Sequence, residues 1–328
     1  MSANTPTLFV LVGPTAVGKT EVAIHLAEQL GAEIISADSM LVYRGMDIGT
    51  AKPTREERRR VPHHMIDVVE PEEEYSVARY ANEASARIAE VVSRGKLPMV
   101  VGGTGLYVQA VVDGIPLPPA PPDHDFRAAM RDVAKNFGAE ELHRRLQAVD
   151  PVSAARLHPR DVKRVIRALE IHHVTGNPAS SFRSSGGPAS YLDQSSRHRY
   201  NAVVLGLRRE REELYRRIEE RADRMLAQGF LDEVERLVQR GCHRGMTSMQ
   251  GLGYRHLIGY LLGETDLETA VSQWKRDTRR FAKRQLTWFG QDKRIQWITI
   301  TDKPMSDLLR EIMDIADSYL QGKVTEKG

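Results

Sequence analysis

Residues 13–20 have the pattern G-x-x-x-x-G-K-T, and this run constrains the chain more than any other segment. It follows an apolar run over residues 8–12, which predicts a buried parallel strand, and precedes a helical pattern of apolar residues that ends at Gly31. In this context the backbone N–H groups of the loop and the N-terminus of the helix favour an anion. Lys19 can add a positive charge against phosphate oxygens, and the Thr20 hydroxyl can hold Mg²⁺. The run therefore predicts a phosphate-binding loop in an α/β fold.

Two further strands are predicted to end near this loop. Residues 33–36 lead into Asp38, and residues 97–101 lead into a glycine-rich turn that contains Thr104. In open α/β sheets the carboxyl ends of parallel strands face one crevice, so we expect Asp38 and Thr104 to lie beside the phosphate loop. A glycine-rich turn can also be a plain tight turn, which leaves a purely structural role for residues 102–105 open.

The segment between these strands is polar. Residues 47–53 are typical of a functional loop, and the charged run 55–60 favours the solvated face of a helix. His63 and His64 precede residues 65–69, which predict a short strand, and residues 75–94 predict an amphipathic helix. Paired histidines can bind a metal, but the sequence offers no third ligand at a suitable spacing.

The best domain boundary is the proline-rich linker over residues 113–122. Helical patterns follow over residues 123–136, 139–149 and 160–175, and then residues 176–199 form a Ser/Gly-rich segment that predicts a loop. Apolar runs at 201–207 and 295–300 predict strands that return to the sheet. We therefore expect a helical insertion domain over residues 121–199, set between the two parts of one α/β core, residues 1–120 and 200–328.

Composition excludes several classes of protein. No apolar run approaches the length of a membrane span, and the N-terminus lacks the pattern of a signal peptide. Cys242 is the single cysteine, so an internal disulfide and a cysteine metal site are excluded, and a reducing cytoplasm is expected. A net charge of +3 is weak evidence for nucleic-acid binding, which makes local clusters of basic residues more informative.

Basic residues gather on two predicted helices. In the first, Arg160, Lys163, Arg164 and Arg167 recur at helical spacing, which indicates either a solvated face or an RNA-binding one. In the second, residues 275–294 hold eight Lys or Arg against two Asp, interleaved with aromatic residues that include Trp288 and Phe289. Basic side chains can neutralise phosphates and aromatic rings can stack on unpaired bases, although both aromatics can equally be core residues.

Arg217 and Arg221 lie one turn apart on a third predicted helix and could reach one anion. Glu213 and Glu220 could instead pair with them as helix-surface ion pairs. The sequence leaves these two interpretations open.

Taken together, these motifs resemble those of the tRNA dimethylallyltransferase family, whose members attach an isopentenyl-type group to the adenosine next to the anticodon. The matching pieces span nearly the whole chain in the family's order. They are residues 13–20, 37–40, 42–53, 102–107, 164–170, 251–254 and 282–289. Each piece alone is modest evidence, but their combination is highly specific.

The resemblance implies a P-loop NTPase-like core, with a parallel sheet flanked by helices, and an all-helical insertion that grips the anticodon arm. It implies dimethylallyl diphosphate as donor, Mg²⁺ as cofactor with Thr20 as its ligand, and a tRNA with adenosines 36 and 37 in its anticodon loop as acceptor. Asp38 resembles the family's general base, Thr104 its partner at the target adenine, and Arg217 a diphosphate ligand; the chain is expected to be a monomer.

The implied binding residues fall into two sets. The diphosphate-binding set is Gly13, Thr15, Ala16, Val17, Gly18, Lys19 and Thr20. The tRNA-binding set is Asp38, Ser39, Met40, Leu41, Thr104, Arg127, Lys163, Arg164, Val165, Ile166, Arg167, Gln250, Gly251, Leu252, Gly253, Tyr254, Arg255, Lys283, Arg284, Gln285, Leu286, Thr287, Trp288, Phe289 and Gly290.

Two positions depart from the family's pattern. Leu41 stands where the family usually has Gln, and Gly290 stands where it usually has Arg. Leucine can neither donate nor accept a hydrogen bond, and glycine removes a possible phosphate contact, so we expect activity to persist with weaker tRNA binding.

Two rival functions share some of these features. A small-molecule kinase of the nucleotide-kinase type would share the phosphate loop, the parallel sheet and the Asp after the second strand, but would have no need of the basic, aromatic helix. A non-catalytic RNA-binding NTPase switch would show RNA affinity under nucleotide control and no dependence on Asp38.

Overall fold

The computed structural model describes residues 5–182 and 199–325, with side chains described as far as Ser318. Its contacts divide the chain into two compact units, one made of Met1–Gly114 with Ser196–Gly328 and the other of Ile115–Ser195. The insertion expected over residues 121–199 corresponds to the second unit, which begins and ends slightly earlier in the chain. Of the predicted loop over residues 176–199, residues 183–198 lie outside the described part.

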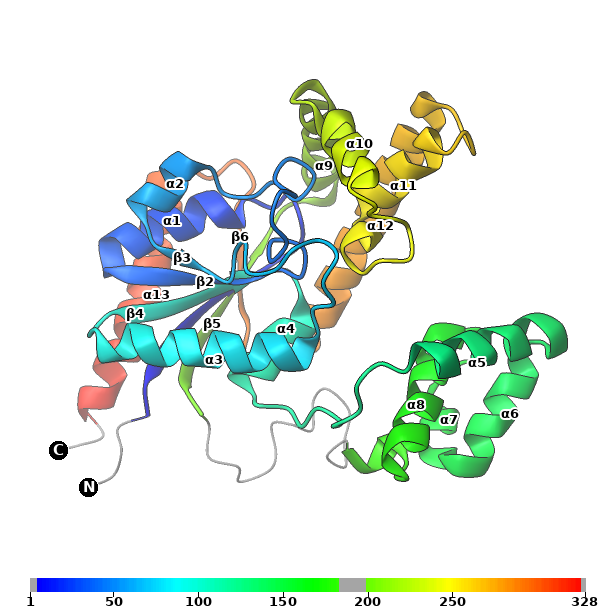
Figure 1. Ribbon diagram of the computed structural model, residues 1–328. Helices are drawn as coiled ribbons and strands as arrows, with labels where there is room; N and C mark the ends of the chain where they lie inside the picture. Colours follow the sequence, from blue (N-terminus) through cyan, green and yellow to red (C-terminus); the bar gives the residue numbers. More distant parts are fainter. Residues whose placement is uncertain (1–4, 183–198, 326–328) are drawn as a thin grey trace. The chain divides into compact units, whose positions relative to one another are not determined.

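The first unit is built on a six-stranded sheet in the order β3-β2-β4-β1-β5-β6 (Figure 1). Every described strand pair is parallel. The strands are β1 (Thr7–Val12), β2 (Ala32–Ala37), β3 (His63–His64), β4 (Leu97–Gly102), β5 (Asn201–Arg208) and β6 (Gln296–Thr299). The order places β1, which carries the phosphate loop, between β4 and β5, so the loops after all three strands meet at one edge of the sheet.

Side chains of β1 alternate between two hydrophobic clusters, as the pleat of a strand requires. Leu8, Val10 and Val12 pack in the cluster that contains residues of α3 and α4, and Phe9 and Leu11 pack in the cluster that contains residues of α1 and α13. Helices therefore cover both faces of the sheet (Figure 1). Their bounds are α1 (Lys19–Leu30), α3 (Val77–Ser93), α4 (Gly105–Val112) and α13 (Met305–Thr325).

This unit also contains α2 (Arg55–Arg60), which lies beside α1, and four helices between β5 and β6 that lie together in Figure 1. They are α9 (Arg211–Ala227), α10 (Phe230–Gln239), α11 (Leu252–Leu261) and α12 (Leu267–Phe289). An aromatic cluster holds three of them together, because Phe230 of α10 packs edge-on against Tyr254 of α11 and against Trp274 of α12.

One predicted strand was wrong. Residues 65–69 do not form a strand, and β3 comprises only His63–His64, which pair with Ile34 and Ile35. Met65 and Asp67 have φ of 63° and 56°, in the left-handed region that interrupts an extended backbone. The amides of Val68 and Val69 instead donate to the carbonyl of Val42.

The second unit is helical. It contains α5 (His124–Phe137), α6 (Ala139–Val149), α7 (Pro151–Arg156), α8 (Val162–Thr175) and the 3₁₀ helix η1 (Ala179–Phe182). The predicted helix over residues 160–175 begins later, at Val162, because the Asp161 side chain caps it by accepting from the amide of Arg164. The buried face of α8 includes Val165, Ile166 and Leu169, which pack with Leu142 and Leu146 of α6. In the part of the chain that the structure describes, no helix is long and apolar enough to cross a membrane.

Candidate active site

The phosphate loop closes over its own lysine. Lys19 Nζ donates to the carbonyl oxygens of Gly13 (2.9 Å) and Pro14 (2.8 Å), which places the ammonium inside the curve of the loop. Gly13 has a φ of 153°, and a Cβ there would lie 2.6 Å from the Leu207 carbonyl oxygen, so the close approach of β5 requires glycine. Burial lowers the pKa of Lys19 to about 8, while the charge of Asp38 opposes this shift.

Asp38 and Thr104 follow neighbouring strands and meet at the same edge. Ser39 N–H donates to Thr104 Oγ1 (3.1 Å), and Thr104 N–H donates to the Ala37 carbonyl (3.1 Å). The Asp38 carboxylate accepts from Met40 N–H (2.8 Å), which fixes its orientation. Asp38 lines a cavity of about 710 Å³ together with Lys19 and Thr20, which we call the large cavity. The structure thus brings the carboxylate and the phosphate loop together.

Gln285 joins the phosphate loop to the glycine-rich turn after β4. Its Oε1 accepts from Thr15 N–H (2.8 Å), and its Nε2 donates to the Gly103 carbonyl (2.9 Å). The side chain is 7% exposed and comes from α12, more than 180 positions away in the sequence from either partner. Gln285 was predicted as a tRNA contact, and its observed hydrogen bonds position the two loops that form the site.

Arg217, Arg221 and Arg224 form a row on one face of α9, and all three line the large cavity. We call them the arginine row. Arg217 Nε donates to the Ala16 carbonyl (3.1 Å), and Arg221 Nη2 reaches the Thr50 carbonyl (3.4 Å). Among the described residues none of the three forms an ion pair with a carboxylate. Burial lowers the pKa of both Arg217 and Arg221, and Asp38 opposes that shift at Arg221.

The sequence left open whether Arg217 and Arg221 form ion pairs with Glu213 and Glu220, and in the structure they do not. Glu213 pairs with Arg209, and Glu220 pairs with Arg216 at 3.9 Å. Arg209 also donates to the Val17 carbonyl (2.9 Å), so it holds the outside of the phosphate loop. Glu213 and Glu220 are thus paired with other arginines, and the arginine row keeps its charge available to an anion.

Glu233 of α10 holds the loop that begins at Asp47. Its carboxylate accepts from the amides of Asp47, Ile48 and Gly49 at 2.8–3.1 Å, and from the Tyr254 hydroxyl at 2.6 Å. The loop is more than 180 positions away in the sequence, so sequence patterns contained no signal for this role. Because Thr50 of this loop contacts Arg221, Glu233 positions one wall of the large cavity.

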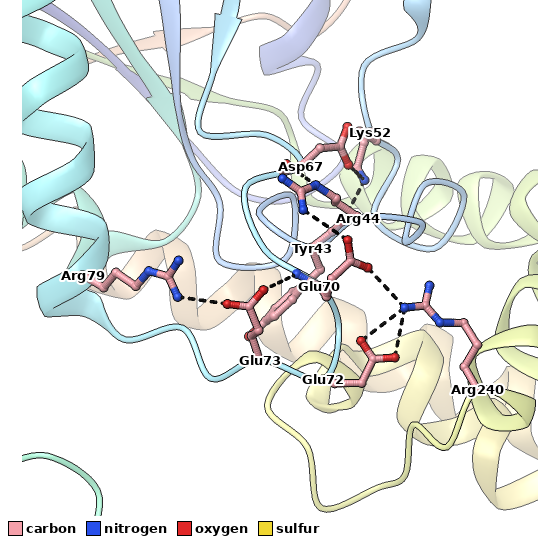
Figure 2. Close-up of polar contacts among 9 residues, drawn as sticks. All are labelled: Tyr43, Arg44, Lys52, Asp67, Glu70, Glu72, Glu73, Arg79 and Arg240. Atoms are coloured by element: carbon pink, nitrogen blue, oxygen red, sulfur yellow. Dashed lines mark hydrogen bonds and ion pairs between the residues drawn. The ribbon is translucent and has the colours of Figure 1, made fainter.

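Lys52 holds the same loop from the other side. Its buried ammonium donates to the Tyr43 carbonyl (2.8 Å) and pairs with both Asp67 and Asp47. Figure 2 shows how this contact continues into a surface network, in which Glu70 pairs with Arg44 and with Arg240, the residue that follows α10. These contacts tie the segment between β2 and α3 to α10 and make it a fixed wall rather than a free loop.

Most of the predicted tRNA-binding residues fall into three groups in the structure. Asp38, Ser39, Met40, Thr104, Gly251, Leu252, Gly253 and Tyr254 line a second cavity, of about 140 Å³, which we call the small cavity. The side chain of Leu41 lines the large cavity. On the last turns of α12 and just beyond, Lys283, Arg284, Thr287, Trp288 and Gly290 are exposed, whereas Phe289 is buried.

The third group lies in the second unit. Lys163 and Arg164 are exposed, whereas Val165 and Ile166 are buried core residues of this unit. Arg127 and Arg167 both pair with Glu170, whose side chain is completely buried. Gln250, in the first unit, is exposed, and Arg255 pairs with Asp277. An RNA-binding role for these residues stays a prediction.

The residues that the structure describes contain no group of three or more His, Cys, Asp or Glu that could hold a metal ion. His64 pairs with Glu33 (2.7 Å), and His63 Nδ1 lies 2.8 Å from the Val61 carbonyl oxygen. A different kind of site fits Mg²⁺, which commonly keeps several waters and takes substrate phosphate oxygens with few protein ligands. Thr20 is exposed and lines the large cavity, so its hydroxyl can supply one such ligand.

The sequence of the chain matches a protein family and several of its known members. A family model described as IPP transferase matches residues 41–292. The chain is similar to the tRNA dimethylallyltransferases of Pelotomaculum thermopropionicum (51% identity over 296 residues, 89% of this chain and 90% of the relative) and Geobacillus kaustophilus (48% over 293 residues, 89% and 90%).

Solved structures agree with the sequence comparison. The full-length tRNA isopentenylpyrophosphate transferase of Bacillus halodurans is similar, with a TM-score of 0.72, 42% identity, and 98% of this chain and 99% of that one covered. A eukaryotic dimethylallyltransferase acting on tRNA has a TM-score of 0.75 and 27% identity, with 97% and 80% covered. The family that the motifs indicated is confirmed: the chain belongs to the IPP transferase family.

Proposed function

We propose that this protein transfers a dimethylallyl group from dimethylallyl diphosphate to N6 of adenosine 37 in the anticodon loop of tRNA and releases diphosphate. The observation that carries the proposal is one carboxylate, Asp38, in the same cavity as the phosphate loop and an arginine row without carboxylate partners. The names of its relatives, which act on tRNA as dimethylallyltransferases, support the same activity.

The acceptor amine needs a base. The exocyclic nitrogen of adenine is a poor nucleophile because its lone pair is delocalised into the ring. As this lone pair forms the bond to C1 of the donor, the C1–O bond breaks and its electrons leave with diphosphate. The proton released from the amine goes to the Asp38 carboxylate, and the Thr104 hydroxyl, held near Ser39, orients the amine.

The leaving diphosphate needs positive charge. The N–H groups of the phosphate loop, the Lys19 ammonium and the Arg217 guanidinium supply it from fixed positions in the large cavity. Mg²⁺, held through Thr20 and the substrate's own oxygens, would neutralise further charge on the diphosphate. No nucleoside triphosphate is consumed, although the loop has the pattern of an ATPase.

The adenine must leave the anticodon-loop stack to reach Asp38, at a free-energy cost of about a few kcal/mol. Basic side chains on α8 and on the last turns of α12, including Lys163, Arg164, Lys283 and Arg284, would offset this cost by holding the RNA backbone. The expectations that the protein is monomeric and cytoplasmic stay predictions.

The test is transfer of label from dimethylallyl diphosphate to an unmodified tRNA transcript in the presence of Mg²⁺. We expect prenylated adenosine without ATP consumption. Asp38→Ala should abolish transfer and leave tRNA binding largely intact, whereas the control Asp232→Ala, at an exposed position of α10, should behave like the wild type. Near-normal turnover of Asp38→Ala excludes Asp38 as the base, and ATP hydrolysis without prenylation contradicts the proposed function itself.

A further inference from the structure

The glycine-rich turn after β4 packs against side chains from the last turns of α12. A Cβ at Gly103 would lie 2.4 Å from Gln285 Nε2, and a Cβ at Gly105 would lie 2.1 Å from Trp288 Nε1. Both distances are far shorter than a van der Waals contact, so each glycine makes room for the side chain that covers it. Helix α12 also contacts α4, which begins at Gly105 (Figure 1). One helix thus covers the turn on both sides of Thr104.

The hydroxyl of Thr104 is not held by the helix that it precedes. Thr104 is the N-cap residue of α4, and an N-cap threonine usually accepts from an amide two or three positions later. Here the side chain caps none of the described amides of α4. Its Oγ1 accepts from Ser39 N–H (3.1 Å) and lies 3.5 Å from Ser39 Oγ. The position of this hydroxyl therefore depends on contacts from outside α4.

Trp288 covers the turn with the five-membered ring of its indole. The three atoms nearest to a Cβ at Gly105 are Nε1, Cδ1 and Cε2, which all belong to that ring. The described lining of the two cavities does not include Trp288, whereas Thr104 lines the small cavity. The next residue, Phe289, is buried in the same hydrophobic cluster as Tyr107 of α4. The indole thus contacts the turn that carries Thr104 without bordering either cavity.

We propose that Trp288 is a positioning residue for the transfer reaction, which acts by holding Thr104 rather than by stacking on an RNA base. The indole stops the turn from moving toward α12, while Gln285 holds it through the carbonyl of Gly103 (2.9 Å). The Thr104 hydroxyl thereby stays where it orients the amine of the target adenine. A misplacement of about 1 Å can cost about 10²-fold in rate. The proposal rests on the proposed function, because Thr104 acts in that reaction.

The experiment measures kcat and the KM for tRNA with dimethylallyl diphosphate as donor. Trp288→Ala should lower kcat about tenfold and leave the KM for tRNA within about threefold, because it frees the turn and removes no substrate contact. Gly105→Ala should cause a similar loss, because its methyl group displaces the indole, although alanine is the better helix former at this position in α4.

Gly259→Ala on α11 is the matched control. Its methyl group also meets the ends of side chains, those of Arg244 and Glu264, which are not in the described lining of either cavity. We expect its kcat and its KM for tRNA to match those of the wild type. A loss as large as that of Gly105→Ala would show that any methyl group on a helix of this unit impairs transfer, and would overturn the assignment.

Double variants test whether Trp288 acts through Thr104. Once Thr104→Ala has removed the hydroxyl, Trp288→Ala should lower kcat by less than about a further twofold. Likewise, Gly105→Ala should cause no further loss in the Trp288→Ala background, where no indole remains to be displaced. Additive losses in these pairs overturn the proposal. A raised KM for tRNA with an unchanged kcat in Trp288→Ala overturns it in favour of base stacking.

Binding of inorganic diphosphate, measured by calorimetry, verifies that each variant keeps a folded phosphate site. If Trp288→Ala does not fold, Trp288→Phe replaces it, because phenylalanine keeps an aromatic ring for stacking but lacks the five-membered ring that covers Gly105. If the wild type transfers no dimethylallyl group, the proposed function fails. If the wild type transfers it and kcat is unchanged in both Trp288→Ala and Gly105→Ala, only this inference fails.

Discussion

Two helices of this protein carry rows of basic residues, and the arginines of the two rows have different partners. On α8 of the second unit, Arg167 pairs with Glu170, and Arg127 of α5 forms two further contacts with the same carboxylate, at 2.7 and 3.0 Å. On α9 of the first unit, the described contacts of Arg217 and Arg221 are to backbone carbonyls. Similar sequence patterns therefore lead to different surroundings: Arg167 shares a buried carboxylate with Arg127, whereas Arg217 and Arg221 have no carboxylate partner among the described residues.

The difference distinguishes arginines that pair with a buried carboxylate from arginines that do not. A buried carboxylate is tolerated when cations and N–H donors surround it, and Glu170 receives both guanidinium groups and the amide of Asp123. A buried arginine without a carboxylate has its pKa lowered by burial, as at Arg217 and Arg221, and gains most when an anion arrives. The comparison predicts that α8 contributes these charges to the stability of its own unit and that α9 contributes them to catalysis.

The largest effect should come from removing the carboxylate on α8. Glu170→Ala leaves Arg127 and Arg167 without their partner and should lower the free energy of unfolding by about 3–5 kcal/mol. Thermal and chemical denaturation, with limited proteolysis of the second unit, would measure this loss. Glu141→Ala is the control, because Glu141 pairs at the surface with Arg144 and Arg145 and its removal should cost at most about 1 kcal/mol. Equal losses in the two variants would show that Glu170 is no more than a surface partner.

The opposite outcome is expected on α9. Arg217→Ala should reduce kcat by about 10²–10³-fold, because it removes a fixed positive charge from the departing diphosphate, while the stability changes little. Arg217→Lys should recover part of the activity, since the charge returns without the planar guanidinium. The adjacent Arg216→Ala is the control, because Arg216 is 70% exposed and pairs with Glu220. A destabilised but active Arg217→Ala would place this arginine in the same class as those on α8.

The contrast also shows how far the sequence could lead. Local patterns predicted the phosphate loop and the strands before Asp38 and Thr104, because each depends on neighbours within a few residues, whereas they left the role of Arg217 open. The partners of these groups lie far away in the chain: Glu233 holds residues 47–49, and Gln285 joins Thr15 to Gly103. Such contacts exist only after the fold brings α10 and α12 to the sheet edge. The strand predicted over residues 65–69 was wrong because its apolar pattern contained no signal for the turns at Met65 and Asp67, where φ is positive.

A third prediction concerns the charge of Lys19, which adds to the field of α9. With a pKa of about 8 in the free protein, Lys19 loses its proton as the pH rises through that value, well below the usual range of lysine. The protonated form binds diphosphate, so the Kd for inorganic diphosphate should rise above pH 8, by up to about tenfold per pH unit. Calorimetry between pH 7 and 9.5 would measure the rise. Lys19→Ala has no titrating group at this position, so it should bind diphosphate more weakly and should lack the part of the rise in Kd that comes from Lys19. Identical pH profiles for the two proteins would contradict the prediction.

The smallest effect is expected at the edge of the large cavity, where Leu41 replaces the glutamine that the family resemblance implies. The Leu41 carbonyl accepts from Asp67 N–H (3.1 Å), a contact that a new side chain leaves in place, and its side chain lines the cavity near Asp38. Leu41→Gln should therefore add one hydrogen bond to tRNA, worth about 0.5–1.5 kcal/mol, and raise tRNA affinity about two- to tenfold. Filter binding and kcat/KM would measure the gain, with Leu41→Met as an apolar control of similar volume that should give none. If only the affinity for tRNA rises and the affinity for the diphosphate donor does not, the two substrates bind to separate parts of this cavity. If the affinity for tRNA does not rise, the RNA does not reach position 41.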